Sequence, residues 1–146
     1  MTKRVNRVVA VLLLFAICLS PVVTTASASA KASAYLSSYS TYMRANGGGN
    51  VSVWFEVYGT GPMDSIGATT VQLQESTDGG STFTTIKRFS YLNYSTMLKQ
   101  DKSGWLSSVS YQGVAGRYYQ AYVTVYAAKD GVSDSRTIFA SKIRAT

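Results

Sequence analysis

The sequence predicts an all-β domain in which about seven antiparallel strands pack as a two-layer sandwich. Clusters of Gly, Asp, Asn and Pro recur along residues 45–135. Such clusters mark turns, because Gly supplies positive φ and Asp or Asn bonds its own backbone. The segments between them are rich in Val, Thr, Tyr, Phe and Ser and alternate between apolar and polar side chains, which is the period of a strand. No segment has a convincing apolar stripe at helical spacing.

Residues 1–30 are predicted to be a secretory signal peptide. An unbroken apolar run covers residues 8–19, and Ala-x-Ala sites predict cleavage after Ala28 or Ala30. The charges before the apolar run are all positive and belong to Lys3, Arg4 and Arg7. We therefore expect a mature domain over residues 31–146.

Two alternatives to cleavage are open for this segment. A signal anchor retained in the membrane needs about 20 apolar residues, and Pro21 ends the run earlier. A lipoprotein would have a small residue before the modified cysteine, but Ile17 precedes Cys18. The favoured interpretation is a secreted protein without stable membrane insertion after cleavage. Its mature part has no cysteine, which fits export from a Gram-positive bacterium better than a disulfide-rich animal route.

Strands are predicted between the turn clusters. The clearest is 117–128, where apolar residues at odd positions alternate with tyrosines and polar residues at even positions. A single helical turn is expected within 93–100, and turns are expected at 59–62, 78–80 and 101–104. The seven predicted strands are 35–44, 50–59, 71–75, 83–91, 105–111, 117–128 and 135–144.

The stretch 116–125 (GRYYQAYVTV) resembles the sixth strand of immunoglobulin and fibronectin type III domains. In those folds a tyrosine near that strand's start forms the tyrosine corner, and the resemblance gives this role to Tyr119. Residues 71–83 (VQLQESTDGGSTF) resemble the third strand, turn and fourth strand of the same folds. The resemblance implies a single immunoglobulin or fibronectin III-like β-sandwich.

The chain beyond residue 30 also resembles a group of small secreted proteins from Gram-positive gut bacteria. The matching segments are 59–69 (GTGPMDSIGAT), the Tyr-rich strand at 117–128, and 133–137 (SDSRT). This resemblance implies an exported protein and a host of that kind. It implies no particular activity.

Catalysis is not expected, and neither is a cofactor or a metal. The chain has no His, which excludes Ser-His-Asp and Cys-His arrangements and His-ligated zinc. Asp130 and Asp134 stand four apart, as calcium ligands could, but calcium usually takes more than two acids, and we favour an Asp-Gly turn. Glu75 shares the parity of apolar Val71 and Leu73, and we interpret it as a carboxylate at the end of a strand.

Tyrosine offers the strongest hint of function, since all eleven tyrosines follow residue 30. If Tyr119 and its odd-numbered neighbours face the core, the even-numbered tyrosines point outward. The last strand is expected beside this one, with Phe139 and Ile143 inside and its basic residues outside. The predicted ligand-binding residues are Tyr118, Tyr122, Tyr126, Arg136, Lys142 and Arg144.

We therefore expect a secreted, non-catalytic extracellular binding module, loosely associated with the cell wall. Tyr gives rigid contact area, and Arg and Lys recognise phosphate or carboxylate, so the expected partner is an anionic cell-wall polymer, a glycan or another extracellular protein. Nucleic acid is not expected, because the net charge of +4 beyond residue 30 is modest and scattered.

Other interpretations are open. The same side chains could form an ordinary solvated strand face that only stabilises the sheet. The chain could instead be a structural subunit of an extracellular assembly joined through strand edges. A secreted toxin or signal protein is a third interpretation, which the composition neither favours nor opposes.

Overall fold

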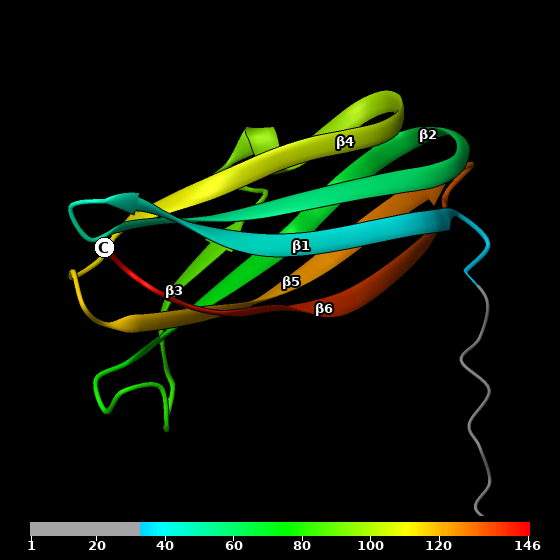
Figure 1. The fold of residues 1–146 in the computed structure, drawn as a ribbon. Coiled ribbons are helices and arrows are strands. Elements are labelled where there is room, and N and C mark those ends of the chain that lie inside the picture. The colour runs from blue at the N-terminus through cyan, green and yellow to red at the C-terminus, as the bar shows by residue number, and fades with distance from the viewer. Residues whose placement is uncertain (1–32) are drawn as a thin grey trace, which may run out of the picture. The chain divides into compact units, whose positions relative to one another are not determined.

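The computed structural model describes residues 33–146, which form an all-β, antiparallel sheet that curls into a half-barrel (Figure 1). The predicted signal peptide lies outside the described residues. The strands are β1 (Leu36–Gly47), β2 (Asn50–Ser76), β3 (Thr84–Ser90), β4 (Leu98–Gln112), β5 (Tyr118–Lys129) and β6 (Val132–Arg144), with a 3-10 turn η1 (Ser95–Met97) before β4.

β2 is 27 residues long and runs through both halves of the curled sheet (Figure 1). Its first part, from Asn50 to Tyr58, lies between β1 and β4. Its last part, from Thr70 to Ser76, lies between β3 and β5. β6 then pairs with β5 at the far end of the strand order β1-β2-β5-β6. The two halves of the curled sheet are therefore connected by hydrogen bonds through a single strand.

The prediction of seven strands was wrong by one, because the predicted turn at 59–62 lies inside β2. The pairing between β2 and β4 shifts register between Tyr58 and Met63, so the Gly-Thr-Gly-Pro segment forms a bulge. Pro62 lacks an N–H, and a bulge is one of the few places where a strand tolerates that loss. Two predicted strands, 50–59 and 71–75, are thus one continuous element.

The predicted turn at 101–104 also lies inside a strand. Asp101 has φ 54° within β4, between Gln100 and Lys102, which pair with β2 just after its bulge. The remaining turns lie between strands, and the short helical turn expected within 93–100 appears as η1. Turn-forming residues therefore indicated where the backbone departs from regular strand geometry. At 59–62 and 101–104 that departure lies inside a strand and does not reverse the chain.

Apolar side chains from β2 and β5 fill the inside of the curled sheet. Phe55, Ile66 and Leu73 of β2 are fully buried, as are Val123 and Val125 of β5. Phe55, Val123 and Val125 lie at the alternate positions that the sequence pattern predicted for 50–59 and 117–128. Burying each such side chain stabilises the fold by about 1.5–3 kcal/mol.

Asp134 anchors the start of β1 to β6. Its Oδ2 accepts hydrogen bonds from Ser33 Oγ at 2.8 Å, Ala34 N at 2.7 Å and Tyr35 N at 3.0 Å. These bonds, the one from Ser33 above all, lower the pKa of Asp134 below its ordinary value. Asp130 donates its backbone N–H to Asp64 Oδ2 at 2.7 Å. Both loop residues considered as calcium ligands thus take part in bonds that hold the backbone.

Gly67 is the position in β2 that tolerates least change. It has φ +144°, and a Cβ there would collide with the backbone carbonyl of Met97. We predict that Gly67→Ala lowers the free energy of unfolding by about 2 kcal/mol or more, measured by urea denaturation. The matched control is Gly61→Ala in the same strand, where no atom lies within 4 Å of the new Cβ and the effect should stay within about 0.5 kcal/mol. Equal effects of the two substitutions would contradict this placement of β2.

Candidate functional site

Tyrosines and polar side chains cover the outward surface of the second half of β2, of β5 and of β6. Tyr122 lies opposite Gln72 on one side and Phe139 on the other, and it is 40% exposed. Its neighbours on β5 alternate with buried residues, as predicted. We call this surface the tyrosine face and define it by Gln72, Gln74, Tyr118, Gln120, Tyr122, Thr124, Tyr126, Thr137, Phe139, Lys142 and Arg144.

One predicted member, Arg136, belongs to the other side of the sheet. Arg136 pairs with buried Val125, whereas Phe139 pairs with Tyr122. The register of β5 and β6 shifts between Tyr119 and Ala121, because β6 contains an extra residue there. The sequence analysis assumed that the even-numbered residues of 135–144 all point outward. In the structure the odd-numbered residues point outward before the bulge and the even-numbered residues after it.

Phe139 was expected in the core and lies on the tyrosine face instead. It is 49% exposed, and its ring centroid lies 5.3 Å from that of Tyr122. Ile143, beyond the bulge, lies opposite buried Tyr119, on the inner side where it was expected. The face consequently gains an aromatic ring and loses a guanidinium relative to the prediction.

Amide and hydroxyl side chains form a hydrogen-bonded row across the tyrosine face. Gln120 Nε2 donates to Gln74 Oε1 at 2.7 Å. Gln72 Nε2 and Gln74 Nε2 donate to Thr85 Oγ1 of β3 at 2.7 and 3.3 Å. Such a row holds its members in fixed rotamers, so this part of the face is ordered before any ligand arrives.

Positive charge gathers at the end of the face where β5 begins. Lys142 Nζ lies 5.9 Å from the ring centroid of Tyr118 and donates to Gly80 O at 3.2 Å. Arg144 Nε donates to Gly116 O at 3.2 Å. Neither cation pairs with a carboxylate of residues 33–146, where the one ion pair joins Arg117 and Glu75. No Asp or Glu belongs to the face, so the two charged side chains that define it are both cations.

Tyr119 lies beneath this end of the face and ties three segments together. Val114 N donates to its hydroxyl at 2.9 Å, and the hydroxyl donates to Glu75 Oε2 at 2.6 Å. Arg117 donates to Glu75 Oε1 at 2.8 Å. Burial, together with the bond to Glu75, raises the pKa of Tyr119 above its ordinary value.

These contacts explain why Glu75 faces the same side of β2 as Val71 and Leu73, with a side chain that is only 13% exposed. It points inward because Arg117 and Tyr119 satisfy both oxygens, so it serves the structure. The bond from Val114, five residues upstream of Tyr119, is of the kind that a tyrosine corner makes. Assignment of Tyr119 to an immunoglobulin-type corner stays a prediction.

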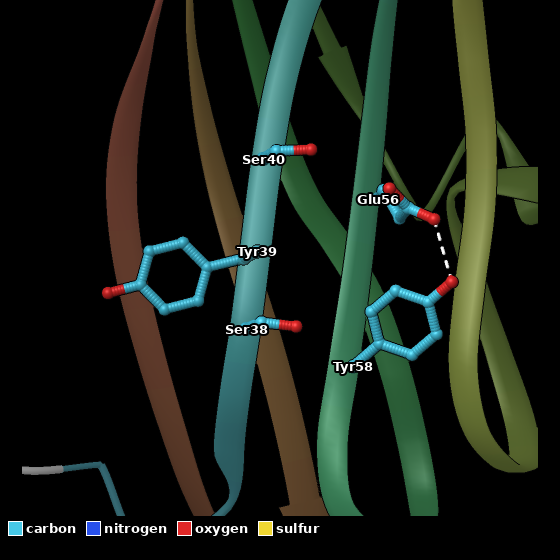
Figure 2. A pocket seen from close by; sticks show the side chains of 5 residues that line it. All are labelled: Ser38, Tyr39, Ser40, Glu56 and Tyr58. Carbon is cyan, nitrogen blue, oxygen red and sulfur yellow. Dashed lines mark hydrogen bonds between the residues drawn. The ribbon is translucent and has the colours of Figure 1, made fainter.

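A hollow on the other half of the sheet was missed by sequence analysis. It has a volume of about 250 Å³ and is lined by residues of β1 and β2, namely Ser38, Tyr39, Ser40, Glu56 and Tyr58 (Figure 2). Tyr58 donates its hydroxyl to Glu56 Oε1 at 2.7 Å, and this bond raises the pKa of Tyr58. Alternation along 50–59 indicates that Glu56 and Tyr58 point outward, but only the pairing of β1 with β2 brings the serines beside them.

The chain matches no protein-family model, no curated protein and no solved structure. Over residues 33–146 no group of three or more His, Cys, Asp or Glu side chains could hold a metal ion. That part of the chain also has no helix long and apolar enough to cross a membrane. The geometry of the two outward faces is therefore the basis of the functional argument.

Tyr119 and Tyr122 allow a direct comparison between structural and surface tyrosines. We predict that Tyr119→Phe lowers the free energy of unfolding by about 1–3 kcal/mol, because Val114 N and Glu75 each lose a buried partner. Tyr122→Phe removes a hydroxyl that bonds nothing within residues 33–146, and we expect a change within about 0.5 kcal/mol. Chemical denaturation of both variants measures this. Equal stability of Tyr119→Phe and the parent would contradict the role given to the buried hydroxyl.

Proposed function

We propose that the chain is an exported, non-catalytic binding module whose tyrosine face binds an anionic glycopolymer outside the cell. The observation on which this proposal rests is the composition of that face. It combines exposed rings with Lys142 and Arg144, and it contains no acidic side chain.

The chemistry of the face suits a sugar polymer that bears phosphate or carboxylate groups. The hydroxyls of Tyr118, Tyr122 and Tyr126 make no hydrogen bond to the part of the chain that the structure describes, so they can bond a ligand. Tyrosine rings offer large contact area at low entropic cost. Lys142 and Arg144 can pair with anionic groups through charge-assisted hydrogen bonds.

Export and fold type are part of the same proposal. The charged start, apolar run and Ala-x-Ala sites of residues 1–30 support secretion. Phosphate-rich polymers of a Gram-positive wall would attract a basic protein and hold it loosely. An immunoglobulin-like sandwich is the fold type that we propose for residues 31–146, and the Tyr119 contact supports it.

A second candidate function is that of a subunit in an extracellular assembly. β4 is 15 residues long and pairs only with β2 among the described strands, so its other edge is open to a strand from another molecule. Leu106 on β4 is 50% exposed. A protein that forms larger species as its concentration rises, and that ignores cell walls, would favour this second function.

The first function is tested by mixing residues 31–146 with purified Gram-positive cell walls and measuring sedimentation across a salt series. We predict binding at low salt that weakens as salt screens the charges. Lys142→Gln with Arg144→Gln should weaken binding about tenfold or more.

The control removes the same two charges elsewhere, as Arg44→Gln with Arg136→Gln, and should bind within about twofold of the parent. Protein that stays in the supernatant at low salt contradicts the proposal. Equal losses in the two double variants would also contradict it, since net charge alone would then explain the binding.

A further inference from the structure

A second outward surface lies on β1 and the first half of β2, away from the tyrosine face. In the register of these strands Ser38 lies opposite Tyr58, Ser40 opposite Glu56, and Tyr42 opposite Trp54. Directly opposed residues of an antiparallel pair share one face of the sheet. The hollow therefore continues directly into an aromatic pair on the same surface.

The aromatic pair is parallel and held in place. The rings of Tyr42 and Trp54 lie with centroids 6.1 Å apart and planes inclined by 1°. Trp54 Nε1 donates to Ser52 Oγ at 3.1 Å, and Asn46 Nδ2 donates to the same oxygen at 3.1 Å. These bonds fix the indole, while Tyr42 is 44% exposed. The result is a preformed aromatic surface beside the hollow.

The polar side of the hollow has hydrogen-bonding capacity to spare. Glu56 Oε1 accepts the Tyr58 hydroxyl, and Oε2 bonds nothing within residues 33–146. The hydroxyls of Ser38 and Ser40 are likewise unbonded over the described residues. In Figure 2 these two serines point from β1 toward the side of β2, whereas the ring of Tyr39 lies on the opposite side of β1. Acceptors and hydroxyls thus border one small space.

We propose that this hollow binds an uncharged sugar ring at the end of a glycan. A carboxylate accepts two hydroxyl protons at once, serine hydroxyls donate or accept, and an aromatic ring packs against the apolar C–H face of a sugar. A volume of about 250 Å³ lies below the range of drug-sized pockets, so it fits one ring rather than the interior of a polymer. The negative charge of Glu56 repels anionic ligands. The ligand expected in the hollow therefore differs from the anionic ligand expected on the basic tyrosine face.

The test uses residues 31–146, which contain all six strands, and four probes: the methyl glycosides of glucose, galactose, mannose and N-acetylglucosamine. We expect at least one to shift backbone amide resonances of β1 and β2, with a dissociation constant of about 1–10 mM. The methyl glycoside of glucuronic acid should bind at least tenfold more weakly than the uncharged glycoside that binds best.

Two matched pairs of variants locate the site. The chain has two tryptophans, so Trp105→Phe should keep a fluorescence response to the sugar and Trp54→Phe should lose it. Glu56→Gln should weaken binding about tenfold, whereas Asp101→Asn, which removes the same charge from exposed β4, should not. If Trp54→Phe loses its folded circular dichroism spectrum, Tyr42→Ser at the exposed position replaces it, read by amide shifts.

Three results would overturn this inference. One is the absence of amide shifts with all four glycosides. Another is a response abolished by Trp105→Phe and kept by Trp54→Phe. The third is binding of the methyl glycoside of glucuronic acid as tight as that of the best uncharged glycoside. None of these results depends on whether the tyrosine face binds cell walls, because the wall assay is read through Lys142 and Arg144.

Discussion

The hydrogen-bonded continuity of β2 is the constraint on which the rest of the structure depends. Four of the other five strands pair with it, and β6 joins through β5. A strand of 27 residues cannot stay flat, and its bulge before Met63 together with the positive φ of Gly67 lets it pass from one half of the curled sheet to the other. Without that passage the two halves would have to associate by side-chain packing alone.

The same strand gives the molecule two outward faces of different chemistry. Its last part places Gln72 and Gln74 on the tyrosine face, where Lys142 and Arg144 supply positive charge. Its first part places Trp54 and Glu56 beside the hollow, where a carboxylate is the charged group. Cations on one face and an anion in the hollow favour ligands of opposite charge, so the two proposals concern different sites and do not compete.

The sequence predicted which side of the sheet a residue faces where apolar and polar positions alternate regularly. It did not predict this where a bulge interrupts the alternation. Counting odd and even positions gave the two sides of 117–128 correctly, because the outward tyrosines of β5 are all even-numbered. In β6 the bulge interrupts the alternation, so this counting placed Arg136 and Phe139 on the wrong sides. A bulge depends on pairing with a distant strand, and parity counted along one segment cannot reveal it.

Long-range pairing also explains the other misses. Glu75 faces inward because Arg117 and Tyr119, more than 40 residues away, meet it there. The hollow needs the register of β1 on β2. The Gly-rich turn at 47–49 does not set that register by itself, because its pairing of Gly47 with Asn50 would place Tyr42 opposite Phe55. Only the bulge between Ala45 and Gly47 brings Tyr42 opposite Trp54.

The continuity of β2 is tested most directly by amide hydrogen exchange on residues 31–146, resolved by residue. The account predicts that amides from Met63 to Gly67 exchange as slowly as those from Val51 to Val57, with faster exchange confined to the bulge at 59–62. Rapid exchange from Gly59 through Gly67, at the rate of an exposed loop, would show two separate strands and would contradict the single strand on which both faces depend.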